Sequence, residues 1–185
     1  MNRRGLLRVA ATGVLGVLDW KPAHASVARA LRLEDLTRRS RHVLLGEPLD
    51  AHSQWERIGD RKHIVTYTRV RTHDVLAGAD PSDSEVLVRT LGGRVGELGE
   101  LVHGEALLQL GERSVMFVMP TSSTLAITAM AQGHYPLLKD ARGAERLLRS
   151  REARELIGEA GAAVQRLPGL EVSEARALLR QLVKR

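Results

Sequence analysis

The sequence IVTYTRVRTHDV, residues 64–75, is the strongest secondary-structure signal in the chain. It is rich in β-branched residues and contains a tyrosine, a composition typical of a β-strand. Alternate residues along most of its length share one face: Ile64, Thr66, Thr68, Val70 and Thr72. The alternation breaks at Val75, so we predict one long strand with a β-bulge near His73 and Asp74.

On the N-terminal side of this strand, residues 58–62 read Ile-Gly-Asp-Arg-Lys and predict a hairpin turn. Residues 42–49 form an apolar stretch that predicts a first strand. Pro48 lies inside this stretch and has no backbone N–H, so it marks a bulge or a sheet edge.

On the C-terminal side, residues 85–91 predict the next strand, which ends at Gly92 and Gly93. The glycine-rich segment 92–104 predicts a long hairpin or a meander. Residues 114–119 (SVMFVM) are almost entirely apolar, which predicts a short central strand. Residues 125–130 predict another strand, with residues 133–137 as its partner.

Helical patterns flank the predicted strands. Residues 31–41 predict a short helix. Over residues 153–167, apolar side chains recur with the i, i+3, i+4, i+7 spacing of a helix, which ends before Pro168 and Gly169. Ser173 predicts the N-cap of a last helix. We expect both C-terminal helices to pack their apolar faces on the barrel or on each other, and the face of the last helix comprises Ala175, Leu178, Leu179 and Leu182.

These elements predict a mainly β fold with α-helices, a five-stranded Greek-key barrel of the OB type. A short N-terminal helix precedes the barrel and two C-terminal helices follow it. We assign residues 1–25 to a signal peptide, residues 26–138 to the barrel domain and residues 139–185 to a helical C-terminal extension.

A series of strand-and-turn patterns spans residues 31–138. It comprises LEDL at 33–36, SRHVLLGEP at 40–48, SQW at 53–55, IVT at 64–66, VLAG at 75–78, Gly92-Gly93 and LGERSVMF at 110–117. The series resembles a group of secreted bacterial proteins of unassigned function. Their strand layout is similar to the netrin-like (NTR) domain of the tissue inhibitors of metalloproteinases. The resemblance implies an NTR-like barrel, and its motifs carry no catalytic chemistry.

The N-terminus has the layout of an export signal. Arg3 and Arg4 form a basic region, and residues 9–18 form an apolar region too short to span a bilayer permanently. Two arginines before two leucines are also typical of a twin-arginine signal, so that route and the general secretory route both remain open. The predicted cleavage site comprises Ala23, Ala25 and the new N-terminal residue, Ser26.

Composition excludes several kinds of site. The chain has no cysteine, so it has no disulfide, thiolate metal site or catalytic thiol. Aromatic residues make up only 3%, which argues against a surface that stacks nucleic-acid bases. Residues 26–138 hold 13 basic and 14 acidic side chains, and residues 139–185 hold 11 and 7. The basic tail is mixed with glutamates along its predicted helices, so we interpret it as a solvated surface.

No pattern of catalytic residues is present. The chain lacks the Gly-x-Ser-x-Gly and P-loop motifs and any HExxH pair. His63 and His73 lie about 33 Å apart along one strand, and the acidic turn Asp80, Asp83 and Glu85 lacks EF-hand spacing. We therefore predict no catalytic, cofactor-binding or metal-binding residue.

Three function classes remain. A non-enzymatic exported domain that binds a protein or peptide partner ranks first, because the export signal comes with a barrel pattern and no catalytic set. An exported hydrolase with a non-standard site is the alternative, with His73, Asp74 and Glu112 as its candidate residues. An OB domain that binds nucleic acid ranks last, because the chain is exported and poor in aromatic residues. The candidate contact surface comprises Trp55, Gly92 and Gly93.

Overall fold

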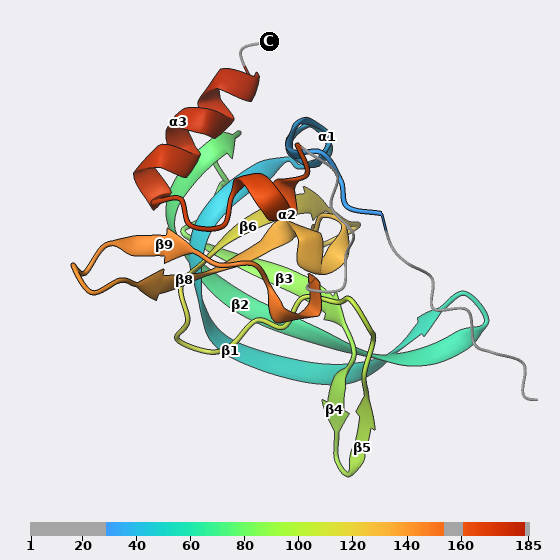
Figure 1. The fold of residues 1–185 in the computed structure, drawn as a ribbon. Helices are drawn as coiled ribbons and strands as arrows, with labels where there is room; N and C mark the ends of the chain where they lie inside the picture. The colour runs from blue at the N-terminus through green and yellow to red at the C-terminus, as the bar shows by residue number, and fades with distance from the viewer. Residues whose placement is uncertain (1–28, 154–160, 184–185) are drawn as a thin grey trace, which may run out of the picture.

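The computed structural model describes residues 29–153 and 161–183, which form a mainly β structure with short helices (Figure 1). The strands are β1 (His42–Ile58), β2 (Arg61–Gly78), β3 (Glu85–Leu91), β4 (Gly93–Val95), β5 (Leu98–Glu100), β6 (Ser114–Pro120), β7 (Leu125–Ile127), β8 (His134–Lys139) and β9 (Glu145–Leu147). The α-helices are α1 (Leu33–Arg39), α2 (Ala163–Arg166) and α3 (Val172–Val183). Two 3₁₀ helices complete the elements, η1 (Met130–Gly133) and η2 (Arg151–Ala153).

Seven strands form one mixed sheet in the order β1-β2-β3-β7-β6-β8-β9, and β4 and β5 form a separate two-stranded sheet. Strand β1 also pairs with β6, so the pairings β1-β2-β3-β7-β6-β1 form a closed circuit. Within that circuit only β3 and β7 are parallel. The main sheet thus has seven strands where the sequence predicts five, because β8 and β9 add to the edge of β6.

The β1–β2 hairpin is the longest feature of the sheet and confirms the predicted turn and bulges. A two-residue turn joins the strands, and Gly59 takes the left-handed conformation that this turn requires (φ +60°). The register between the strands shifts where His73 is inserted and again between Pro48 and Asp50. Both strands are longer than predicted. Their outer halves are polar and exposed, so the apolar pattern did not reveal them.

The apolar side chains of β6 contribute to two separate cores, because its residues alternate between the two faces of the sheet. Met116 and Val118 join a core within the strand circuit. Val115 and Phe117 face the other way and pack against the three α-helices and β8–β9. Strand β6 is buried from Ser114 to Val118 and pairs with β1, β7 and β8, which confirms the predicted central strand.

The predicted partner of residues 125–130 is wrong. Strand β7 pairs with β3 and β6, whereas β8 pairs with β6 and β9. Between β7 and β8 the chain passes through η1, and Ala129 and Met130 have positive φ angles of 57° and 58°. These angles break the strand direction, so a direct hairpin between β7 and β8 cannot form.

The C-terminal extension is less helical than predicted. Helix α3 confirms the last predicted helix, but it begins at Val172, so Ser173 lies inside the helix and is not its N-cap. At this end of the helix the backbone N–H of Glu171 donates to Glu174 Oε2 (2.8 Å). Residues 145–147 form β9, a strand that the sequence did not predict. In the helix predicted over 153–167, the described residues form the end of η2 and the short α2, and residues 154–160 lie outside the described part. Gly161 has φ +93°, which a right-handed helix cannot accommodate, so α2 begins only after it. Within the described residues, no helix is long and apolar enough to cross a membrane.

Candidate functional site

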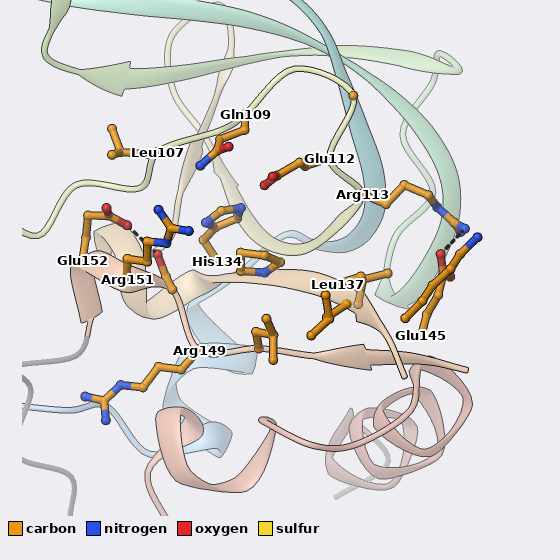
Figure 2. Close-up of a pocket in the computed structure, with 16 residues that line it drawn as sticks. Leu107, Gln109, Glu112, Arg113, His134, Leu137, Glu145, Arg149, Arg151 and Glu152 are labelled. Carbon is orange, nitrogen blue, oxygen red and sulfur yellow. Dashed lines mark hydrogen bonds and ion pairs between the residues drawn. The ribbon is translucent and has the colours of Figure 1, made fainter. Parts of the chain in front are cut away.

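The residues of the predicted hydrolase site are not gathered in one pocket. His73 contacts Glu47 (Nε2–Oε2 3.0 Å), and Asp74 forms an ion pair with Arg176 of α3. Glu112 instead lines a cavity of about 570 Å³ that neither His73 nor Asp74 reaches. Figure 2 shows Glu112 in that cavity beside His134, a histidine that the sequence did not single out.

The residues considered for metal binding also lie apart. His63 contacts Glu100 (Nδ1–Oε1 2.6 Å). His73 lies ten residues further along β2 and contacts a different carboxylate, Glu47. Within residues 29–153 and 161–183, no group of three or more His, Asp or Glu side chains is arranged to hold a metal ion. The predicted cleavage residues Ala23, Ala25 and Ser26 lie outside the described residues.

Trp55, the aromatic residue of the predicted contact surface, is 46% exposed near the end of the β1–β2 hairpin. We use the name hairpin arm for residues 50–69 of this hairpin together with residues 92–101, which include β4 and β5. In Figure 1, β4–β5 projects on the side of the molecule opposite the helices. Trp55 is therefore available at the surface for contact with a partner.

The hairpin arm carries further exposed apolar side chains. Ile58 lies at the β1–β2 turn, Leu98 begins β5, and Leu101 directly follows β5 and is 71% exposed. Exposed aromatic and aliphatic residues on a projecting element are common in protein-binding surfaces. Sequence reasoning missed the two leucines because a glycine-rich segment gives no periodicity from which exposure could be judged.

Gly92 and Gly93 have a structural role in this surface. Gly92 is buried, has φ +87° and donates its N–H to the carbonyl oxygen of Ile64 (2.8 Å). A Cβ atom on Gly93 would lie 2.2 Å from Thr66 Oγ1 and 2.5 Å from Ser53 Oγ. The two glycines therefore let the chain leave β3 and lie close against the β1–β2 hairpin.

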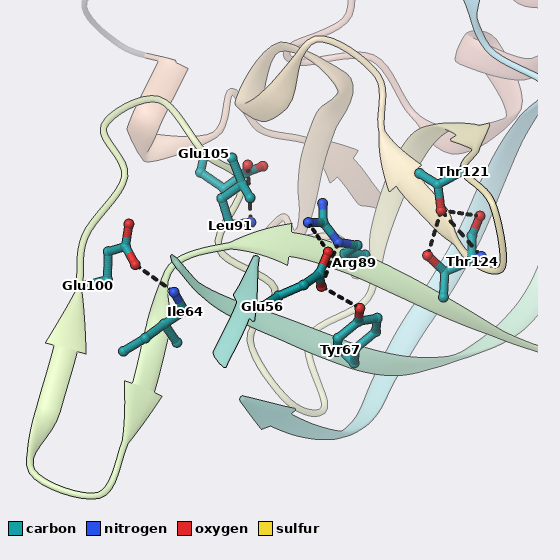
Figure 3. A network of polar contacts seen from close by, with 9 residues as sticks. All are labelled: Glu56, Ile64, Tyr67, Arg89, Leu91, Glu100, Glu105, Thr121 and Thr124. Atoms are coloured by element: carbon teal, nitrogen blue, oxygen red, sulfur yellow. Dashed lines mark hydrogen bonds and ion pairs between the residues drawn. The ribbon is translucent and has the colours of Figure 1, made fainter. Parts of the chain in front are cut away.

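Glu100 fastens the two hairpins of the arm together. Its Oε2 accepts a hydrogen bond from the backbone N–H of Ile64 (2.6 Å), as Figure 3 shows, while Oε1 contacts His63. The hydrogen bond with His63 lowers the pKa of the Glu100 carboxyl, so it is ionised at neutral pH. Because Ile64 pairs with Trp55 in the β1–β2 ladder, this contact fixes β5 relative to Trp55.

A charged network holds the outer face of β1, β2 and β3. Arg89 donates to both oxygens of Glu56 (2.8 and 3.3 Å), and the Tyr67 hydroxyl donates to Glu56 Oε2 (2.7 Å), as seen in Figure 3. Arg89 and then Tyr67 lower the pKa of Glu56, whose hydrogen bond in turn raises the pKa of Tyr67. These residues come from three neighbouring strands, so the network ties residues 56 and 67 of the hairpin arm to β3 and makes this face rigid.

A buried carboxyl group, that of Glu105, lies where the chain leaves β3 toward the hairpin arm. Glu105 is only 7% exposed and accepts hydrogen bonds from the N–H groups of Leu91 (3.2 Å) and Ala106 (3.1 Å). Burial raises the pKa of Glu105, because a carboxylate loses hydration there. The sequence gave no signal for this residue, since its position depends on how the 101–113 loop folds back.

The candidate functional site is thus the hairpin arm, an exposed apolar surface built on fixed polar contacts. Comparisons of the chain with protein-family models, with curated proteins and with solved structures found no match.

Proposed function

We propose that this protein is an exported, non-enzymatic domain with an OB-type barrel that binds a protein or peptide partner through its hairpin arm. The single observation that carries the proposal is the exposure of Trp55, Leu98 and Leu101 on two hairpins that Glu100 ties together. Tryptophan contributes strongly to protein interfaces, and a fixed surface loses little conformational entropy on binding.

The strand pairings support the barrel part of the proposal. A circuit in which β1 pairs with both β2 and β6 leaves no free sheet edge at those positions, which is the property of a barrel. OB barrels use the face of their second and third strands and the loop between the first two for binding. The β1–β2 turn and the face that carries Tyr67 and Arg89 occupy the corresponding places, an argument by analogy with the fold.

Charge on this face favours a protein partner over a nucleic acid. A single-stranded nucleic acid requires a positively charged groove along its backbone. Here Arg89 is paired with Glu56, and Arg69 is paired with Asp50 and Glu85. These two arginines are thus neutralised by neighbouring carboxylates, so neither is free to bind a nucleic-acid backbone.

The proposal is tested by affinity purification from the periplasmic and secreted fractions with the wild-type protein and a Trp55→Ala variant. We expect a reproducible partner whose recovery falls at least tenfold with the variant, since a tryptophan hot spot contributes about 2 kcal/mol or more. A Val183→Ala variant is the matched control, because Val183 is an exposed apolar residue on α3, outside the hairpin arm. Equal recovery by wild type and Trp55→Ala would refute the role of the arm.

A further inference from the structure

We propose that the cavity between the 107–113 loop, β8 and residues 145–152 binds a small amphiphilic anion, an acidic headgroup on an alkyl chain. This site is separate from the hairpin arm and does not depend on the protein-binding function. The cavity has a volume of about 570 Å³, within the range of small-molecule sites.

One wall of the cavity is apolar and open to solvent. Leu107, Leu138 and Leu148 all line it, and all three are exposed. They come from a loop, the end of β8 and the residue after β9, so only the fold brings them together. Exposed leucines that converge on one cavity indicate an apolar ligand, because covering them removes apolar surface from water.

The cavity also contains cations without partners. Arg113 is paired with Glu145 (2.7 Å), whereas Lys139 and Arg151 form no ion pair within the described residues. Four cationic and three acidic side chains line the cavity, which gives an excess of one positive charge. An anionic headgroup beside Arg151 forms charge-assisted hydrogen bonds with its guanidinium group, which are stronger than neutral ones.

His134 supplies an independent indication of a ligand. It is only 4% exposed, lines the cavity, and its Nδ1 atom has no hydrogen-bond partner in the structure. Figure 2 shows Gln109, Glu112 and Arg151 around it. Burial lowers the pKa of His134 to about 4, so the ring is neutral at neutral pH and leaves the positive charge to the arginine. Buried polar atoms without hydrogen-bond partners are rare in folded proteins. A bound ligand with polar atoms can supply the hydrogen bond that His134 Nδ1 lacks.

Glu112 provides a way to test the sign of the ligand's charge. It lines the same cavity and forms no ion pair within the described residues, so it repels an anion and attracts a cation. Replacement of Arg151 and of Glu112 by neutral residues must therefore change the affinity for an anionic ligand in opposite directions.

Isothermal titration calorimetry of the purified protein with decanoate tests this site. We expect binding of one decanoate, weakened at least tenfold by Arg151→Gln and tightened by Glu112→Gln. Arg142→Gln is the matched control, because Arg142 is an exposed cation on the neighbouring β8–β9 turn and does not line the cavity. Melting temperatures of all variants, which change only exposed residues, confirm that the fold is retained.

Acetate and decan-1-ol separate the two parts of the ligand. Both are expected to bind at least tenfold more weakly than decanoate, since one lacks the alkyl chain and the other lacks the charge. Three results overturn the proposal: no decanoate binding at millimolar concentration, unchanged affinity in Arg151→Gln, or decan-1-ol binding as tightly as decanoate. None of these results bears on the hairpin arm, which lies elsewhere on the molecule.

Discussion

Gly46 shows how closely the core inside the strand circuit is packed. It lies in β1 with ordinary extended backbone, yet a Cβ atom at this position would be 2.6 Å from Val70 Cγ1 and 2.7 Å from Met116 Cε. In the sequence, Gly46 lies inside the apolar stretch 42–49, and a glycine in the interior of a strand normally lowers its stability. In the structure it lets three strands approach one another.

We predict that Gly46→Ala lowers the free energy of unfolding by about 1–3 kcal/mol, because the added methyl group overpacks the core. Chemical denaturation monitored by circular dichroism measures this change. Gly99→Ala is the control, since its nearest neighbour lies at an ordinary 3.7 Å, and it should change stability by less than about 0.5 kcal/mol. An equally stable Gly46→Ala variant would show that the strands are not held so close.

His134 predicts a specific dependence of stability on pH. Its pKa is lowered from 6.5 to about 4 by burial, so between these values the unfolded chain binds a proton that the folded chain does not. Stability due to this residue is therefore present above about pH 6.5 and is lost as the pH falls toward 4, by about 3 kcal/mol in total.

The measurement is the free energy of unfolding of wild type and His134→Gln between pH 7 and pH 4. Glu105 acts in the opposite direction, because its raised pKa makes the folded chain bind the extra proton as the pH falls. The difference between the two proteins isolates His134, and the wild type should lose more stability than the variant. Parallel curves would contradict the assignment of a buried neutral histidine.

At the scale of elements, local signals predicted the strands well and failed where long-range pairing decided the structure. The bulge at His73 followed from the broken alternation, since a strand that buries one face must restore its register. Strand β9 left no such signal: Leu147 is fully buried only because β9 pairs with β8 and its backbone bonds to Leu170. No local pattern of three residues contains that information.

Helix α3 confirms the expectation that a C-terminal helix packs its apolar face on the body of the protein. Leu179 and Ala175 are fully buried in the core that α3 shares with the sheet and with α1. We predict that Leu179→Ala costs about 2–5 kcal/mol of stability, the range for large-to-small changes in a core. Gln181→Ala on the exposed side of the same helix is the control for helix propensity. A melting temperature unaffected by Leu179→Ala would mean that α3 is not part of the core.

At the scale of the whole molecule, the sequence predicted a mainly β architecture and left the surfaces largely unassigned. Trp55 could be found because an exposed tryptophan is a familiar contact residue. The leucines around the hairpin arm and the cavity of His134 could not be found, because each surface is assembled from segments far apart in the chain. The expected signal peptide concerns residues outside the described part of the structure.

Export predicts a defined mature chain. If cleavage follows Ala25, mass spectrometry of the periplasmic or secreted protein should give a chain that begins at Ser26. Replacement of Arg3 and Arg4 by lysine should block export only if the twin-arginine route is used. Exported protein that retains Met1 would contradict cleavage at this site.

Site-specific photocrosslinking in the native envelope tests the central claim that the hairpin arm binds a protein partner. The photoreactive residue is placed at Ile58 and at Leu101 in two variants that keep Trp55, and at Arg142, on the β8–β9 turn, in a third. The proposal predicts the same protein adduct from positions 58 and 101 and none from position 142. Absence of adducts at both arm positions, or identical adducts at all three, would contradict it.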